Sequence, residues 1–192
     1  MKYTQVRTDT FSTLQMNAGV IAKNFNPETG ELVRTDILGA TTGGLTFNAN
    51  PEYEDFGEDI DNVPANTKQL KKLTRYDPTA SGTFLTVGDL MVKYLSGAGT
   101  MADGHFTPTH ELLTSDFNDI WLIGDYSDIN TGENAGYLAI HIMDALNTTG
   151  FQWVSSKDGK GQFSFEFHGH YNLEDMDVVP FEIYIKVGTQ SD

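Results

Sequence analysis

Two segments near the end of the chain alternate strictly between apolar and polar residues. Over 162–171 one face holds Phe163, Phe165, Phe167 and Tyr171, and the opposite face holds Ser164, Glu166, His168 and His170. Over 179–187 the apolar face holds Phe181, Ile183, Ile185 and Val187, and the polar face holds Glu182, Tyr184 and Lys186. Alternation of this kind predicts β-strands with one face on a core and the other in water, as in antiparallel sheets.

Shorter apolar runs predict further strands, and one segment predicts a helix. The strands are expected at 20–22, 45–47, 81–87, 105–113, 119–124, 137–145 and 151–155, and Asp158-Gly159 is a turn signal for a hairpin into 162–171. In the helix, Thr86 caps the first amides, Asp89 suits the positive end of the helix dipole and Gly97 ends it. The pattern predicts a mainly β, antiparallel sandwich or barrel-like fold with one α-helix flanking the sheet.

The apolar signal stops at Asn48, and a long acidic loop is expected over 48–78. Its acidic side chains are Glu52, Glu54, Asp55, Glu58, Asp59 and Asp61, and its lysines are Lys68, Lys71 and Lys72. Spaced apolar residues interrupt the acidic stretch at Tyr53, Phe56, Ile60, Val63 and Leu70. These apolar residues suggest a segment that docks on another molecule, for example a second copy; a solvated surface loop is the alternative.

The 192-residue length fits a single domain over 1–192, and the formal net charge of −15 excludes ordinary nucleic-acid binding through a basic surface. There is no cysteine for a disulfide or a thiolate metal site. Neither a signal-peptide core nor an apolar run of about eighteen residues occurs, so we expect no membrane partner and a protein that is first cytoplasmic. Residues 1–16 are expected to form an arm that is ordered by contact with something else.

Few residue patterns suggest chemistry. Glu166, His168 and His170 share a strand face and, with His141, offer ligands for a divalent metal, although histidines on a wet sheet face are the commoner case. The oxygen-rich stretches 125–134 and 58–62 lack the spacing of a helix-loop-helix calcium site. No nucleophile elbow and no phosphate-binding loop is present, so we expect no enzyme and no cofactor.

Several short segments, taken in order, resemble a known family. ILGATTGGLTF (37–47), EDFGEDIDNVP (54–64), KKLT (71–74) and TASGTFLTV (79–87) resemble the major tail proteins, or tail tube proteins, of long, non-contractile-tailed bacteriophages. The resemblance covers about 19–187. It implies a β-sandwich flanked by a helix, assembled as hexameric rings that stack into a tube through which double-stranded DNA is ejected.

The resemblance also implies partners and surfaces. A tape measure protein would fill the lumen, tail terminator and distal tail proteins would bind the ends, and the protein would assemble in the host cytoplasm into the virion. The 48–78 loop would reach the next ring, and the arm 1–16 or the tail 188–192 would fasten neighbours. The residues expected at the inter-ring contact are Tyr53, Asp55, Phe56, Glu58, Asp59, Asp61, Lys68, Lys71 and Lys72, and those expected to face the lumen are Ser164, Glu166, His168 and His170.

The alternative function is a monomeric β-sandwich module that binds a carbohydrate or a protein. Trp121 and Trp153 would be its stacking platforms. Both lie in apolar sequence that predicts a strand, which favours a place in the core for each.

Overall fold

A computed structural model describes residues 7, 10, 14–15, 17–125 and 135–188. Within them, the fold is mainly β and antiparallel with one α-helix, which confirms the fold class that the sequence predicts. The helix is α1 (Asp89–Ser96), and short 3₁₀ turns lie at Arg34–Asp36, Lys68–Leu70 and Thr114–Asp116. The strands are β1 (Val20–Ala22), β2 (Thr41–Asp55), β3 (Lys71–Phe84), β4 (Gly99–Ala102), β5 (His105–Pro108), β6 (Asn118–Asp125), β7 (Tyr137–Asn147), β8 (Phe163–His168) and β9 (Phe181–Lys186).

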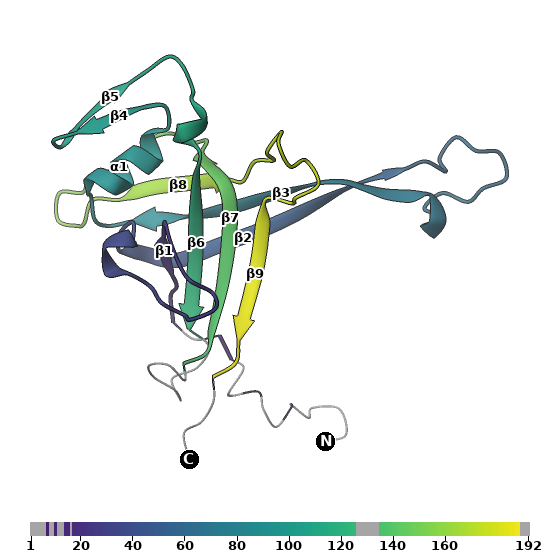
Figure 1. Ribbon diagram of the computed structural model, residues 1–192, viewed down its shortest axis with the longest axis horizontal. Coiled ribbons are helices and arrows are strands. Elements are labelled where there is room, and N and C mark those ends of the chain that lie inside the picture. Colours follow the sequence, from purple (N-terminus) through teal and green to yellow (C-terminus); the bar gives the residue numbers. More distant parts are fainter. Residues whose placement is uncertain (1–6, 8–9, 11–13, 16, 126–134, 189–192) are drawn as a thin grey trace.

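The strands form two layers that cross (Figure 1). One layer contains β1, β6, β7 and β9, and the other contains β2, β3 and β8. The strand β7 joins them, because its first part pairs with β6 and β9 and its end, at Leu146 and Asn147, pairs with β8. A register shift opposite Asn118–Ile120 and a positive φ of 46° at Asp144 mark the bend, as expected of a β-bulge.

The core lies between the two layers. Phe163, Phe165 and Phe167 of β8 are buried there, as their alternation predicts, and they face Ile120 and Ile142 of the other layer. Full burial of one such side chain contributes about 1.5–3 kcal/mol, so each of the three phenylalanines adds an appreciable term to the hydrophobic stabilisation. The helix α1 adds the buried side chains of Met91, Tyr94 and Leu95 to the same cluster.

The helix ends as predicted but begins differently. Gly97 follows it with a φ of 72°, the left-handed conformation that favours glycine. The cap position is Gly88, and Thr86 instead accepts a hydrogen bond at Oγ1 from the Ala40 amide over 2.9 Å, so the predicted Thr86 cap is wrong. Near the other end, the Lys93 ammonium donates to the Gly99 carbonyl over 2.6 Å and pairs with the buried Asp116 carboxylate at 2.5 Å.

The predicted strands at 105–113 and 151–155 differ most from the structure. Only His105–Pro108 of the 105–113 segment is a strand, and it pairs with β4 in a small separate sheet. The 151–155 segment is no strand, since a single bridge joins Val154 to Gln162. The side chain of Asn147 donates to the Gly150 carbonyl and accepts from the Glu166 amide. In a longer hairpin these two backbone groups would bond to each other, so the Asn147 side chain takes the place of a strand-to-strand hydrogen bond.

None of the helices in the described part of the chain is long and apolar enough to cross a membrane. The arm 1–16 and the tail 188–192 lie mostly outside the described residues, and so does most of the 125–134 calcium candidate. Their predicted roles therefore stay predictions.

Candidate assembly surfaces

The expected loop over 48–78 is mostly a β-hairpin that projects from the body (Figure 1). The strands β2 and β3 are paired from Thr41 opposite Phe84 to Asp55 opposite Lys71. The loop prediction is therefore wrong for 48–55 and 71–78, which are strand, and holds only for the connection 56–70. Polar cross-strand pairs stabilise the arm in place of a core. Arg75, for example, contacts the carboxylate of Glu52 through two hydrogen bonds of 2.7 and 2.8 Å.

The connection 56–70, called the hairpin tip from here on, has a defined shape. The carboxylate of Asp55 accepts hydrogen bonds from the amides of Gly57 over 2.9 Å and Asn66 over 2.7 Å, and these bonds hold the pKa of Asp55 below its usual value. The Phe56 amide donates to the Leu70 carbonyl, which closes the base of the tip. Asp55 therefore acts within its own subunit and orders the tip.

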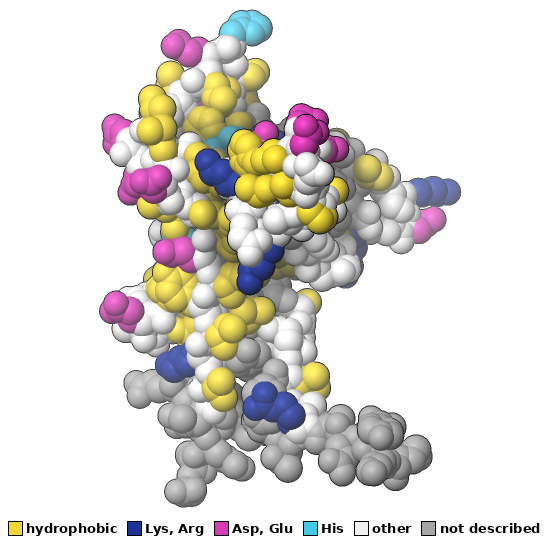
Figure 2. Space-filling view, turned by 90° about the vertical axis from the view of Figure 1, so that its right-hand side faces the viewer, with side chains coloured by type: hydrophobic (Ala, Val, Ile, Leu, Met, Phe, Trp, Pro, Cys, Tyr) yellow, Lys and Arg dark blue, Asp and Glu magenta, His cyan; other side chains and the backbone are white. Residues whose placement is uncertain are grey.

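Large apolar side chains stay exposed at this end of the hairpin. Tyr53 is 57 % exposed and Phe56 is 53 % exposed, and Ile60 is also largely accessible. Glu58, Asp59 and Asp61, which lie among them, make no ion pair within the described residues. Figure 2 looks at the molecule from the side of the hairpin and shows hydrophobic side chains spread among acidic and basic ones on that face. Such exposure at the end of an arm is typical of an interaction surface.

The structure brings all the residues expected at the inter-ring contact to this outer end of the hairpin. Tyr53 and Asp55 end β2, Lys71 and Lys72 begin β3, and Lys68 lies in the 3₁₀ turn between them. The Lys71 ammonium lies 5.6 Å from the centre of the Tyr53 ring and contacts the Asn66 side chain.

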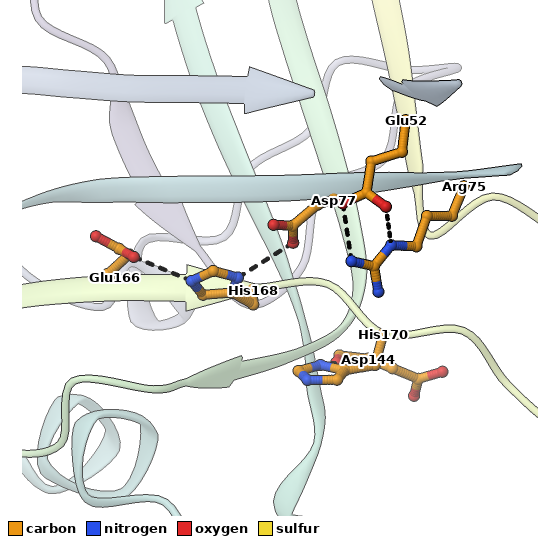
Figure 3. A network of polar contacts seen from close by, with 7 residues as sticks. All are labelled: Glu52, Arg75, Asp77, Asp144, Glu166, His168 and His170. Carbon is orange, nitrogen blue, oxygen red and sulfur yellow. Dashed lines mark hydrogen bonds and ion pairs between the residues drawn. The ribbon is translucent and has the colours of Figure 1, made fainter. Parts of the chain in front are cut away.

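A second surface is the outward face of β2, β3 and β8, which is polar throughout. The cross-strand register puts side chains with hydroxyl, amide, imidazole or carboxylate groups on it: Thr46, Asn48, Asn50, Asp77, Thr79, Ser81, Thr83, Ser164, Glu166 and His168. His168 is placed between two carboxylates, with Nδ1 3.2 Å from Asp77 and Nε2 3.0 Å from Glu166 (Figure 3). Three of the four residues expected at the lumen thus share this face.

His170, the fourth, does not lie there. It follows the end of β8 and lies beside Asp144 (Figure 3), with its Nδ1 3.0 Å from the Asp144 carbonyl. Its ring packs edge-on against Phe117. His141 is also elsewhere, stacked on Trp121 and 3.1 Å from Asp119, and its hydrogen bond lowers the pKa of Asp119. The metal-ligand set Glu166, His168, His170 and His141 is therefore not assembled, and the described residues contain no other such group.

The third surface is the face of β9 that the sequence predicts to be core. Ile183 is 50 % exposed, Ile185 is 61 % exposed and Val187 is similarly accessible, so this prediction is wrong. On β7, Ile140 is paired with Ile183 and Leu138 with Ile185. Ile140 and Leu138 line a groove together with Leu45 and Phe47 at the base of the hairpin.

One edge of β9 also lacks a neighbouring strand among the described residues. Among the described strands β9 pairs only with β7, which leaves one row of its backbone amides and carbonyls without a strand partner. Sequence reasoning missed this surface because alternation identifies two faces of a strand without saying what covers the apolar one.

The two tryptophans have different environments. Trp121 is 7 % exposed and lies in the core, as predicted. Trp153 is 66 % exposed on the loop before β8, so its predicted burial is wrong.

No protein-family model and no curated protein matches this chain. One solved structure that matches this chain over most of its length is described as "Virion of native gene transfer agent (GTA) particle". It has 9 % sequence identity and a TM-score of 0.40, and the alignment covers 88 % of this chain and 95 % of that chain. Similarity at this level is too remote to indicate a function.

Proposed function

We propose that the protein is a structural subunit that polymerises with copies of itself, as the tail tube protein of a long-tailed phage. Six copies would form a ring, and stacked rings would form the conduit for double-stranded DNA. The sequence resemblance over 37–87 supports this proposal, and the three surfaces described above are compatible with it.

The observation that carries the proposal is the hairpin. An arm that ends in exposed Tyr53, Phe56 and Ile60 gains little from its own subunit, because its tip packs against no other element of the described chain. Burying these side chains against another molecule would stabilise an assembly. We propose that the hairpin tip, together with the adjoining ends of β2 and β3, contacts the next ring, with Asp55 shaping the tip from within. The contact residues are Tyr53, Phe56, Glu58, Asp59, Asp61, Lys68, Lys71 and Lys72.

The free edge of β9 supports lateral association within a ring. A strand that carries exposed Ile183 and Ile185 and one unpaired edge is a hazard for uncontrolled aggregation unless a partner covers it. In a closed ring every copy would cover the same edge of its neighbour, so no edge would remain open.

The polar face of β2, β3 and β8 suits the lumen. Arg75 is the basic side chain at its margin, and Glu52 already neutralises it. The rest of this face would not hold phosphates by charge, so DNA could pass without being bound. It consists of Ser164, Glu166 and His168 with the hydroxyl and amide groups beside them. A tape measure protein would occupy this space before ejection, and tail terminator and distal tail proteins would close the tube ends.

Electron microscopy of the purified protein tests the proposal, together with a variant in which Asn-Gly replaces residues 53–74. The replacement joins Glu52 to Arg75, which are already cross-strand partners, so the body should keep its fold and its circular dichroism spectrum. We expect rings or tubes from the natural chain and separate, folded subunits from the variant. Long tubes from the variant would refute the role of the hairpin.

A monomeric binding module remains the second candidate because Trp153 is exposed. An aromatic ring on a surface loop is a common platform for a sugar or peptide. A natural chain that stays a folded monomer at high concentration and binds a glycan through Trp153 would favour this function.

A further inference from the structure

The hairpin tip has a complementary surface at the opposite end of the same molecule. The strand β3 runs from Lys71 at the tip to Phe84, and β8 begins opposite Phe84 with Phe163. Residues 151–161, called the β8-entry loop from here on, precede that point, so they lie at the other end of the long axis (Figure 1). At about 3.3 Å per residue, the 14-residue strand separates the two surfaces by roughly 45 Å.

The β8-entry loop combines exposed apolar side chains with basic ones. Phe151, Trp153 and Val154 are all largely accessible, and Lys157 and Lys160 follow within a few residues. Neither lysine makes an ion pair in the described part of the chain.

Three other cations differ from these two, whereas Arg34, Lys68 and Lys72 likewise make no ion pair within the described residues. Lys23 pairs with Asp36, Lys93 with Asp116 and Arg75 with Glu52, all within their own subunit.

The hairpin tip is net negative, with three carboxylates against Lys68, and has the same apolar character, whereas the β8-entry loop is net positive, with two lysines against Asp158. The exposed Phe56 and Ile60 of the tip stand beside Glu58, Asp59 and Asp61, which likewise have no ion pair within the described residues. The two surfaces therefore match in both properties that guide recognition between proteins, apolar contact area and charge sign.

We infer that the hairpin tip of one copy docks on the β8-entry loop of the next copy. The two surfaces cannot meet within one subunit, because they lie at opposite ends of it. Contact between unlike surfaces at opposite ends is heterologous, so each added copy presents a new tip and a new loop. The inference rests on the proposed polymerisation and names the receiving surface for the hairpin.

A charge exchange tests the docking. Glu58→Lys with Asp59→Lys, or Lys157→Glu with Lys160→Glu, puts like charges together, and we expect each pair to raise the critical concentration for assembly at least tenfold in sedimentation. Mixing the two variants pairs opposite charges again and should restore co-assembly. Glu28→Lys with Glu31→Lys has the same charge change as the first pair and should leave assembly unchanged, because these exposed residues lie on a turn that packs beside Tyr137 at the start of β7 and not on either surface.

Disulfide trapping gives a second readout, because the chain has no natural cysteine. Phe56→Cys subunits mixed with Trp153→Cys subunits should form a covalent dimer under mild oxidation. Phe56→Cys mixed with Leu173→Cys, which is exposed on a different loop, should not.

The outcomes separate the docking from the proposed function. Tubes that form normally from both charge variants, without trapping between Phe56→Cys and Trp153→Cys, would refute the docking and leave polymerisation intact. A natural chain that never assembles, with no trapped dimer, would refute both.

Discussion

Replacing Ile183 and Ile185 of β9 by threonine tests whether this face is completed by another copy. Threonine keeps the β-branched shape that suits a strand, so the pairing of β9 with β7 should persist. Since each isoleucine is about half exposed, roughly half of its 1.5–3 kcal/mol burial energy is still to be gained on assembly, or about 1 kcal/mol per side chain. The pair then contributes about 2 kcal/mol per interface, and its loss should weaken each contact about thirtyfold.

Two measurements separate assembly from folding. Sedimentation should show a critical concentration about thirtyfold higher, whereas urea unfolding of the isolated subunit should change by no more than about 1 kcal/mol, as is usual for exposed sites. Ile142→Val, in the core, is the matched control, with a cost of about 0.5–1.5 kcal/mol in unfolding. Unchanged assembly with the threonine pair would refute the proposed interface, and a loss of subunit stability above that of the control would show that β9 belongs to the core.

Three further perturbations address a buried ion pair, the polar face and the hairpin tip. Lys93→Met removes the main cause of the lowered pKa of Asp116, and breaking this pair should destabilise the subunit by about 2–4 kcal/mol at pH 7. Because the folded-state pKa of Asp116 is lowered, its contribution is present above pH ~4 and is lost on acidification, so the difference between variant and natural chain in urea unfolding should shrink below that pH; a constant difference would contradict this account. Asn48→Lys on the polar face should make tubes retain short duplex DNA in a salt-dependent manner, while Asn48→Asp should not, and equal retention by both would contradict a lumenal place for this face. Asp55→Asn should speed hydrogen exchange at the tip amides and impair assembly with a change of no more than about 0.5 kcal/mol in unfolding, and unchanged exchange would contradict its ordering role.

The hairpin shows where sequence reasoning stops. Residues 48–55 and 71–78 have little apolar content, so no alternation identifies them as strands. Their pairing depends on contacts across the hairpin, such as Glu52 with Arg75, and these partners are far apart in the sequence. The acidic and apolar composition nevertheless marked the tip as an interaction segment, which remains a prediction.

The sequence by itself determined the fold class, the buried aromatic face of β8 and the end of α1 at Gly97, because each follows from local periodicity or from one residue's backbone preference. The tertiary structure decided which apolar face is buried. The two strands with the cleanest alternation had opposite outcomes, since the second layer and α1 cover Phe163, Phe165 and Phe167 whereas nothing in the described chain fully covers Ile183 and Ile185. Burial depends on what packs against a strand, and the sequence of the strand alone does not identify that neighbour.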